Sequence, residues 1–286
     1  MIHHCFQPPA LNFVLRTSLL LCALIASGIT PSHAQSDTAP RRLPDTEVTR
    51  LGSLSAYLIE PTTRYDHAVL GDAIEAGGFA IERNGQRLLY RLNDDSVFED
   101  RRVRLADLDG DGQPEAIVVK SYQKRGAAIA VYRILADRIE PLAESPAIGT
   151  RHRWLNPAGI ANFTGSGEIM IAAVITPHLA GSLRLYRLAG SALQEVARID
   201  GYTNHIIGSR DLDLGRLADV DGDGVPEIVL PSIDRRSLAA ISFKQGARVL
   251  RKVAVEGRVK TLVSANGASA VVTTETSANQ PVDLGR

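Results

Sequence analysis

Cysteine is nearly absent from this sequence. Its 286 residues include two, Cys5 and Cys22, and both lie within the first 34 residues. If that segment is removed, the remaining chain has no disulfide framework, no thiol nucleophile and no thiolate metal site. An excess of charge is absent too, since 32 basic residues balance 32 acidic ones. The composition therefore gives no electrostatic reason to expect nucleic acid or an anionic membrane surface as a partner.

Long hydrophobic runs are also missing. The apolar stretch at residues 19–26 is well below the roughly 20 residues needed to span a bilayer. It follows Arg16, and the small residues Ser32 and Ala34 close the segment, which predicts a secretory signal peptide over residues 1–34. We expect an exported chain, periplasmic or extracellular, with no integral membrane segment after cleavage. A flexible lead-in is expected at residues 35–49.

Helical periodicity is not evident after the signal segment, whereas repeats are. The stretch ADLDGDGQPEAIVV from Ala106 returns as ADVDGDGVPEIVL from Ala218, and ANFTGSGEIMIAAV lies between them. Alignment of Asp107, Asn162 and Asp219 gives spacings of 55 and 57 residues. Evenly spaced copies indicate a repeated structural unit.

Each repeat continues with short segments of strand length, bounded by glycine, proline, asparagine or aspartate, as at 116–119, 127–133 and 138–143. Units of roughly four short strands are typical of propeller blades. We therefore predict an all-β fold, a β-propeller of about five blades over residues 50–274, with a polar tail at 275–286; four to six blades are possible, although six are many for this length. Residues 50–59 would pair with the last unit, closing the ring and removing open sheet edges.

The two acidic repeats place carboxylates at loop positions 1, 3, 5 and 9 and a glycine at position 6, where a sharp turn is needed. This spacing wraps alternate side chains around one point, and such a cage of hard oxygen atoms suits Ca²⁺. The predicted ligands are Asp107, Asp109, Asp111, Glu115 and the carbonyl of Gln113 in the first loop, and Asp219, Asp221, Asp223, Glu227 and the carbonyl of Val225 in the second.

Other interpretations of these loops fit less well. An EF-hand would carry glutamate at position 12, where Val118 and Leu230 stand. Mg²⁺ demands tight octahedral geometry, Zn²⁺ prefers histidine or cysteine, and a phosphate site would need positive charge. The remaining alternative is a solvated acidic turn. The middle loop, residues 162–168, keeps the glycines but has a single carboxylate, so we expect it to bind little or no ion.

At these residues the chain resembles the FG-GAP, or VCBS-type, β-propeller repeat family. The resemblance is specific at 107–115 and 219–227, weak at 162–168, and covers roughly residues 60–275. It implies a propeller, Ca²⁺ in the acidic loop between the first two strands of a blade, and export. It implies no reaction.

A second candidate site lies in the segments that precede the repeated strands, which would converge around the central channel. The ligand-face candidates are Glu99, Asp100, Arg151, His152, Trp154, Asn156, Asn204, His205 and Arg210, with Tyr65, Asp66 and His67 as neighbours. The alternative is a structural interface of Arg–Asp pairs. Glu99 and Asp100 are adjacent and would point opposite ways on a strand. His152 or His205 with Asp100 could imitate part of a triad, but no serine has a nucleophile-elbow context.

The sequence therefore predicts an exported Ca²⁺-binding propeller, a non-catalytic binding or scaffold module for a protein or glycan, with no catalytic residue assigned. The alternative is a secreted hydrolase or lyase with its site at the mouth of the channel. Fold alone does not decide between them, because propellers host both binding and catalysis.

Overall fold

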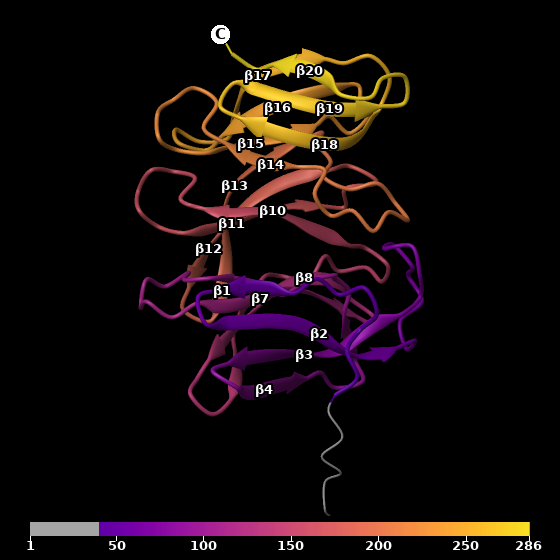
Figure 1. Ribbon diagram of the computed structural model, residues 1–286, viewed down its shortest axis with the longest axis vertical. Helices are drawn as coiled ribbons and strands as arrows, with labels where there is room; N and C mark the ends of the chain where they lie inside the picture. Colours follow the sequence, from indigo (N-terminus) through magenta and orange to yellow (C-terminus); the bar gives the residue numbers. More distant parts are fainter. Residues whose placement is uncertain (1–39, 286) are drawn as a thin grey trace, which may run out of the picture. The chain divides into compact units, whose positions relative to one another are not determined.

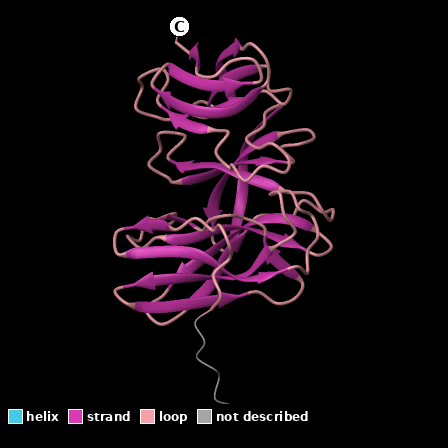
Figure 2. Ribbon diagram, turned by 45° about the vertical axis from the view of Figure 1, so that its right-hand side comes forward, coloured by secondary structure: helices cyan, strands magenta, loops and turns pink. Residues whose placement is uncertain are grey.

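The computed structural model describes residues 40–285, and every regular element in this range is a β-strand (Figure 2). The all-β prediction is confirmed. The predicted signal peptide, residues 1–34, lies outside the described residues. Within residues 40–285 there is no helix of the length and apolarity that crossing a membrane requires.

The strands are short and follow one another closely along the chain. The first group is β1 (Thr49–Leu51), β2 (Leu54–Thr62), β3 (Glu75–Arg83), β4 (Gln86–Arg91), β5 (Ser96–Phe98) and β6 (Arg104–Ala106). The second is β7 (Glu115–Tyr122), β8 (Gly126–Ile134), β9 (Ile139–Glu144), β10 (Leu155–Ala161), β11 (Met170–Ile175), β12 (Ser182–Ala189) and β13 (Ala192–Asp200). The third is β14 (Arg216–Ala218), β15 (Glu227–Pro231), β16 (Ser237–Ser242), β17 (Arg248–Ala254), β18 (Val259–Asn266), β19 (Ser269–Thr274) and β20 (Gln280–Asp283).

These strands form three sheets (Figure 1). The first has 13 strands in the order β1-β2-β3-β5-β7-β8-β9-β13-β12-β11-β10, with β4 paired to β3 and β6 to β7. Two joins in it are narrow: β3 meets β5 through Ala76 and Phe98, and β9 meets β13 in parallel through Glu144 and Ala192. The other sheets are β14-β15-β16-β17 and β18-β19-β20.

The predicted propeller of about five separate blades is therefore wrong. The strands are grouped in sheets of 13, 4 and 3, not in a ring of equal four-stranded units. The expected closing strand also differs, because β2 pairs with β1 and β3 and not with the C-terminal sheet. The repeat in the sequence predicts strands and turns, but the pairing of strand edges depends on contacts between repeats that the period does not report.

The segments at both ends of the predicted domain are packed. Part of the expected lead-in is held in place, since Leu43 is buried and Arg42 bridges to Ile59. Part of the expected polar tail forms β20, in which Val282 is buried, and Leu284 just after the strand is buried too. The ordered domain is thus longer at each end than the composition predicts.

The apolar runs arise because single strands serve two cores. In β7, Ile117 and Val119 pack into one hydrophobic cluster, while Ala116 and Val118 pack into another on the opposite face. Strand β11 alternates in the same way between two clusters. Because successive side chains point to opposite faces, a strand buried on both sides must be apolar throughout. Glu115 and Glu227 are the first residues of two such buried strands, β7 and β15.

Candidate functional site

The two acidic loops occupy equivalent places in the fold. The first joins β6 to β7 and the second joins β14 to β15, each within an antiparallel pair closed by an alanine opposite a glutamate, Ala106 with Glu115 and Ala218 with Glu227. Each loop brings three carboxylates together, with oxygen atoms within 4.8 Å of one another. The groups are Asp107, Asp109 and Glu115, and Asp219, Asp221 and Glu227. Both clusters could hold a metal ion.

The first aspartate of each loop shapes the turn. Asp107 accepts hydrogen bonds from the backbone N–H groups of Gly110 at 2.8 Å and Gly112 at 3.0 Å. Asp219 accepts in the same way from Asp223 and Gly224, both at 3.0 Å. Gly112 and its counterpart have φ near +80°, a conformation that favours glycine. This positive φ explains why the motif carries glycine at position 6 of the loop.

The glutamate closes each loop from inside the protein. Glu115 accepts the backbone N–H of Leu108, and Glu227 that of Val220, each at 2.9 Å. Glu227 is fully buried, and its Oε1 has no hydrogen-bond partner among the described residues. A buried carboxylate oxygen without a partner is costly, and a cation at this cluster would compensate the buried charge.

Burial also changes the protonation of these glutamates. It raises the pKa of Glu115 to about 7, with a further increase from the three aspartates and an opposing effect from the Leu108 N–H. Burial likewise raises the pKa of Glu227. A buried carboxyl group beside other carboxylates is costly to ionise, and a nearby cation would favour its ionised form.

The third aspartate of each loop bonds to the backbone of the loop itself. Asp111 accepts the backbone N–H of Gln113 at 2.7 Å, and Asp223 accepts that of Val225 at 2.9 Å. Neither aspartate belongs to the three-carboxylate groups. The structure therefore gathers three of the predicted side-chain ligands in each loop and leaves the fourth at the rim.

Two basic side chains near the loops were not predicted from the sequence. Arg133, on β8, pairs with Asp109 at 2.8 Å, and Lys244 pairs with Asp223 at 2.9 Å. In the middle loop, by contrast, Thr164 and Ser166 bond to each other through hydroxyl groups at 2.9 Å. Within the described part of residues 162–168 no three-ligand group forms.

The ligand-face candidates separate into three places. Asn156 and Asn204 are fully buried, and each donates its side-chain amide to the other's backbone carbonyl, at 3.3 and 2.9 Å. These bonds tie β10 to the segment before β14. Each Oδ1 lacks a hydrogen-bond partner in the described residues. The pair is a structural cross-link.

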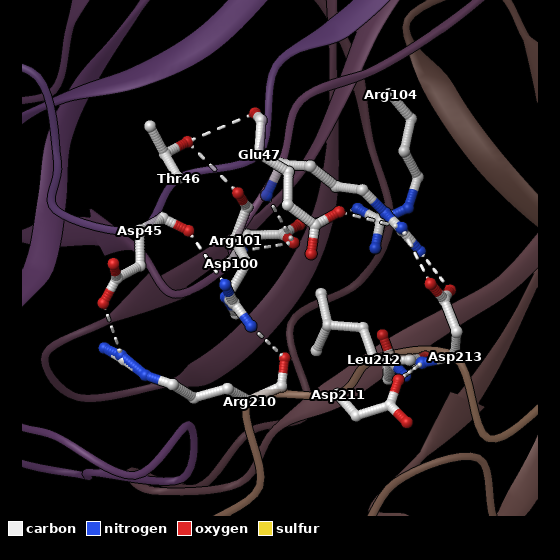
Figure 3. Close-up of polar contacts among 12 residues, drawn as sticks. Asp45, Thr46, Glu47, Asp100, Arg101, Arg104, Arg210, Asp211, Leu212 and Asp213 are labelled. Atoms are coloured by element: carbon white, nitrogen blue, oxygen red, sulfur yellow. Dashed lines mark hydrogen bonds and ion pairs between the residues drawn. The ribbon is translucent and has the colours of Figure 1, made fainter. Parts of the chain in front are cut away.

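Asp100 and Arg210 belong to an ionic network (Figure 3). Arg104 pairs with Asp100 at 2.7 Å, and Arg210 pairs with Asp72 and, at 3.3 Å, with Asp45. Arg102 joins Glu47, at 3.1 Å, to Asp213. The network links the N-terminal segment to residues 210–213, which is the interface of Arg–Asp pairs that the sequence left as an alternative.

The other candidates gather around a cavity of about 220 Å³, which we call the histidine pocket. It is lined by His67, His152, Arg153, Trp154, Thr176, His178, Leu179 and Ile207. Glu99 and His205 lie behind this lining, since Glu99 pairs with His67 at 2.7 Å and His205 with His178 at 2.8 Å. Arg151 reaches the same region through Asp66, at 2.7 Å. The triad of His152 or His205 with Asp100 does not form. His178 was missed, although it is one of few histidines in the sequence.

Comparisons with known proteins show little similarity to this chain. No family model matches the chain, and no curated protein matches it. A solved structure from Bacteroides fragilis, described as a proposed 6-phosphogluconolactonase, is similar at 12% identity and a TM-score of 0.42. The similarity covers 82% of this chain and 65% of that one, so the chain spans less than two thirds of its neighbour.

These comparisons correct two predictions. The assignment to the FG-GAP or VCBS family is wrong, because no family model matches the chain. The comparisons also give no support to the predicted non-catalytic scaffold or to the expectation that the chain is not an enzyme, since the solved structure named above is described as an enzyme. A likeness this low assigns no reaction to this chain.

Proposed function

We propose that the protein is an exported Ca²⁺-binding β-protein in which each acidic loop takes one ion. The observation that carries the proposal is the buried glutamate of each loop, which faces two aspartates across less than 4.8 Å. Bound Ca²⁺ turns the mutual repulsion of three carboxylates into coordination. The ion joins the loop to the first residue of a strand that lies in the core.

Ca²⁺ fits these loops better than other cations. Its six to eight oxygen ligands can come from three carboxylates, backbone carbonyl groups and water in a flexible arrangement. Zn²⁺ would draw on histidine or cysteine, and neither occurs in the two groups. Extracellular modules bind Ca²⁺ with Kd values of about 0.1–1 mM, which suits an exported chain. Contact with a protein or glycan partner stays a prediction from the sequence.

Thermal unfolding tests this function. The purified protein is melted in EGTA and then with Ca²⁺ or Mg²⁺ added back. The expected result is a rise in Tm with Ca²⁺ that Mg²⁺ does not reproduce. At 100-fold excess over Kd each site would add about 2.7 kcal/mol to the free energy of unfolding. An equal Tm in all three solutions would contradict the proposal.

Matched variants assign the effect to the loops. Asp109→Ala and Asp221→Ala should each remove part of the Ca²⁺-dependent rise, and the double variant should remove all of it. Asp137→Ala is the control, because Asp137 is an exposed aspartate that pairs only with Arg138 among the described residues. A full Ca²⁺ response in the double variant would overturn the assignment.

A further inference from the structure

Every histidine in residues 40–285 lies in one cluster. The four histidines are spread from residue 67 to residue 205 in the sequence. In the structure, the ring centroids of His67 and His152 are 5.0 Å apart, as are those of His178 and His205. Trp154 packs against His205 at 4.8 Å. Four imidazole side chains therefore gather at one cavity, outside the acidic loops.

The central contact of the cluster pairs a histidine with a buried carboxylate. The Nδ1 of His67 is 2.7 Å from Glu99 Oε1, and Glu99 is fully buried. The other oxygen, Oε2, accepts the hydroxyl of Ser121. Because both oxygens act as acceptors, the hydrogen-bond network assigns the proton of the neutral His67 ring to Nδ1 and leaves the lone pair on Nε2. A buried carboxylate that orients a histidine in this way is the arrangement of a general base and its positioning group.

The backbone around the cavity is strained at two lining residues. His152 has φ of +58° and Thr176 has φ of +48°. Of the described residues other than glycine that have positive φ, Thr176 is the β-branched one, and such residues rarely adopt this conformation. Hydrogen bonds hold both: the N–H of His152 donates to the Tyr65 hydroxyl at 3.1 Å, and that of Thr176 to the carbonyl of Trp154 at 2.9 Å. Strained backbone persists where the surroundings enforce it, and such positions cluster at active sites.

The walls of the pocket are mostly uncharged. The Nε2 of His205 donates to the carbonyl of Ser209 at 2.9 Å, so its Nδ1 accepts the Nε2–H of His178 at 2.8 Å. Burial lowers the pKa of both rings to about 4, which keeps them neutral at neutral pH. The apolar side chains of Leu179 and Ile207 are 58% and 66% exposed at the rim.

Arg153 places a positive charge at the cavity. Among the described residues, its guanidinium has one hydrogen bond, to the carbonyl of His152 at 3.3 Å. The pocket thus combines a base, a cation and an apolar rim in about 220 Å³. This combination fits a small uncharged substrate that develops negative charge on one oxygen during reaction.

We propose that the histidine pocket is a hydrolytic active site for small uncharged esters, with His67 as the general base and Glu99 as the residue that positions it. His67 Nε2 takes a proton from water while the water oxygen bonds to the acyl carbon, and the carbonyl electron pair moves onto the oxygen beside Arg153. When that pair returns, the ester C–O bond breaks and the leaving alkoxide takes the proton from the His67 imidazolium. The products are a carboxylic acid and an alcohol, and water is the only co-reactant.

Hydrolysis of p-nitrophenyl acetate by the purified full chain tests the site. The expected result is saturable release of p-nitrophenol, slower in D₂O. His67→Gln should lower kcat/KM at least about 100-fold, the usual contribution of a general base. Glu195→Gln, outside the pocket on β13, is the control and should leave the rate unchanged. Non-saturable hydrolysis no faster than that of free imidazole at equal imidazole concentration would overturn the proposal, as would a wild-type rate in His67→Gln.

The role of Glu99 needs a separate readout, because removing a buried carboxylate can also disturb folding. Glu99→Gln should lower kcat with little change in KM, and Glu99→Asp should recover part of the loss. Arg153 is exposed, so Arg153→Gln should fold normally and lower kcat, because the cation beside the developing oxyanion is lost. Melting curves of each variant report folding. If Glu99→Gln or Arg153→Gln is folded and fully active, the proposed mechanism is wrong.

Discussion

The backbone N–H of Leu108 donates a 2.9 Å hydrogen bond to the buried carboxylate of Glu115, across the turn that carries the three aspartates. Val220 and Glu227 repeat this contact in the second loop at the same distance. The glutamate thus anchors the turn to the start of a core strand and also belongs to the three-carboxylate group of its loop. From this arrangement we expect ion binding and strand stability to be coupled.

Replacing Glu227 with glutamine should separate Ca²⁺ binding from the stability of the strand. The amide oxygen can still accept the Val220 N–H, while the buried charge is gone. We expect stability in EGTA to stay equal or rise, and the Ca²⁺-dependent gain to fall by about 2.7 kcal/mol at 100-fold excess over Kd. Chemical denaturation with and without Ca²⁺ measures both quantities. Glu168→Gln, in the degenerate middle loop, is the control; a similar loss of Ca²⁺ response there would contradict the account.

The basic side chains beside the loops should oppose Ca²⁺ binding. Lys244 pairs with Asp223, and its charge lies next to the second cluster. Lys244→Gln should therefore tighten Ca²⁺ binding at the second loop, and Arg133→Gln should do so at the first. Titration calorimetry checks the two Kd values. Arg138→Gln, at an exposed pair elsewhere, should change neither. Weaker Ca²⁺ binding in Lys244→Gln would show that the lysine supports the site.

Glu75 should make the protein less stable at high pH. Burial, followed by the charges of Glu99, Asp72 and Asp100, raises its pKa to about 9. Its Oε1 has no hydrogen-bond partner in the described residues. Because the folded state holds the proton more tightly than the unfolded state, this group's contribution falls as pH rises from about 4.5 to about 9.

Glu75→Gln should accordingly be more stable than the wild type at pH 8, by at least about 1 kcal/mol, and equally stable near pH 4. Urea unfolding of the two proteins from pH 4 to pH 9 gives the comparison. A constant difference over this range would show that Glu75 keeps its ordinary pKa in the folded protein.

The buried histidines should make the protein less stable at acid pH, whereas Glu75 makes it less stable at high pH. Burial lowers the pKa of His178 and His205 from 6.5 to about 4, so the unfolded state binds more protons between these values. Their contribution is fully present above pH 6.5 and is lost as pH falls toward 4. His205→Gln should lose less stability than the wild type between pH 7 and pH 5. Denaturant unfolding at both pH values tests this, and equal losses would contradict it.

The sequence predicted the parts of this protein that depend on local pattern. Strand β7 follows from an apolar run that must fill two cores, and the acidic turn follows from aspartate spacing and from Gly112. The sheets were not predictable in the same way, because their joins rest on single pairs such as Ala76 with Phe98 and Glu144 with Ala192. A repeat period carries no information about such pairs.

The candidate sites also differ in whether local sequence could predict them. The three acidic ligands of each loop lie within nine residues and could be recognised together. The pairing of His67 with Glu99 could not, because it depends on how the chain after β2 folds back over the segment after β5. The strand expected at Glu99 and Asp100 ends at Phe98, so alternation does not explain their contacts: Glu99 meets His67, and Asp100 meets Arg104.

Counting the bound ions tests the central claim most directly. Titration calorimetry of the EGTA-treated protein with Ca²⁺ should give two sites in the wild type, one in Asp221→Ala and none in the Asp109→Ala, Asp221→Ala double variant. A wild type that binds no Ca²⁺, or a double variant that still binds two ions, would contradict the assignment of the acidic loops as metal sites.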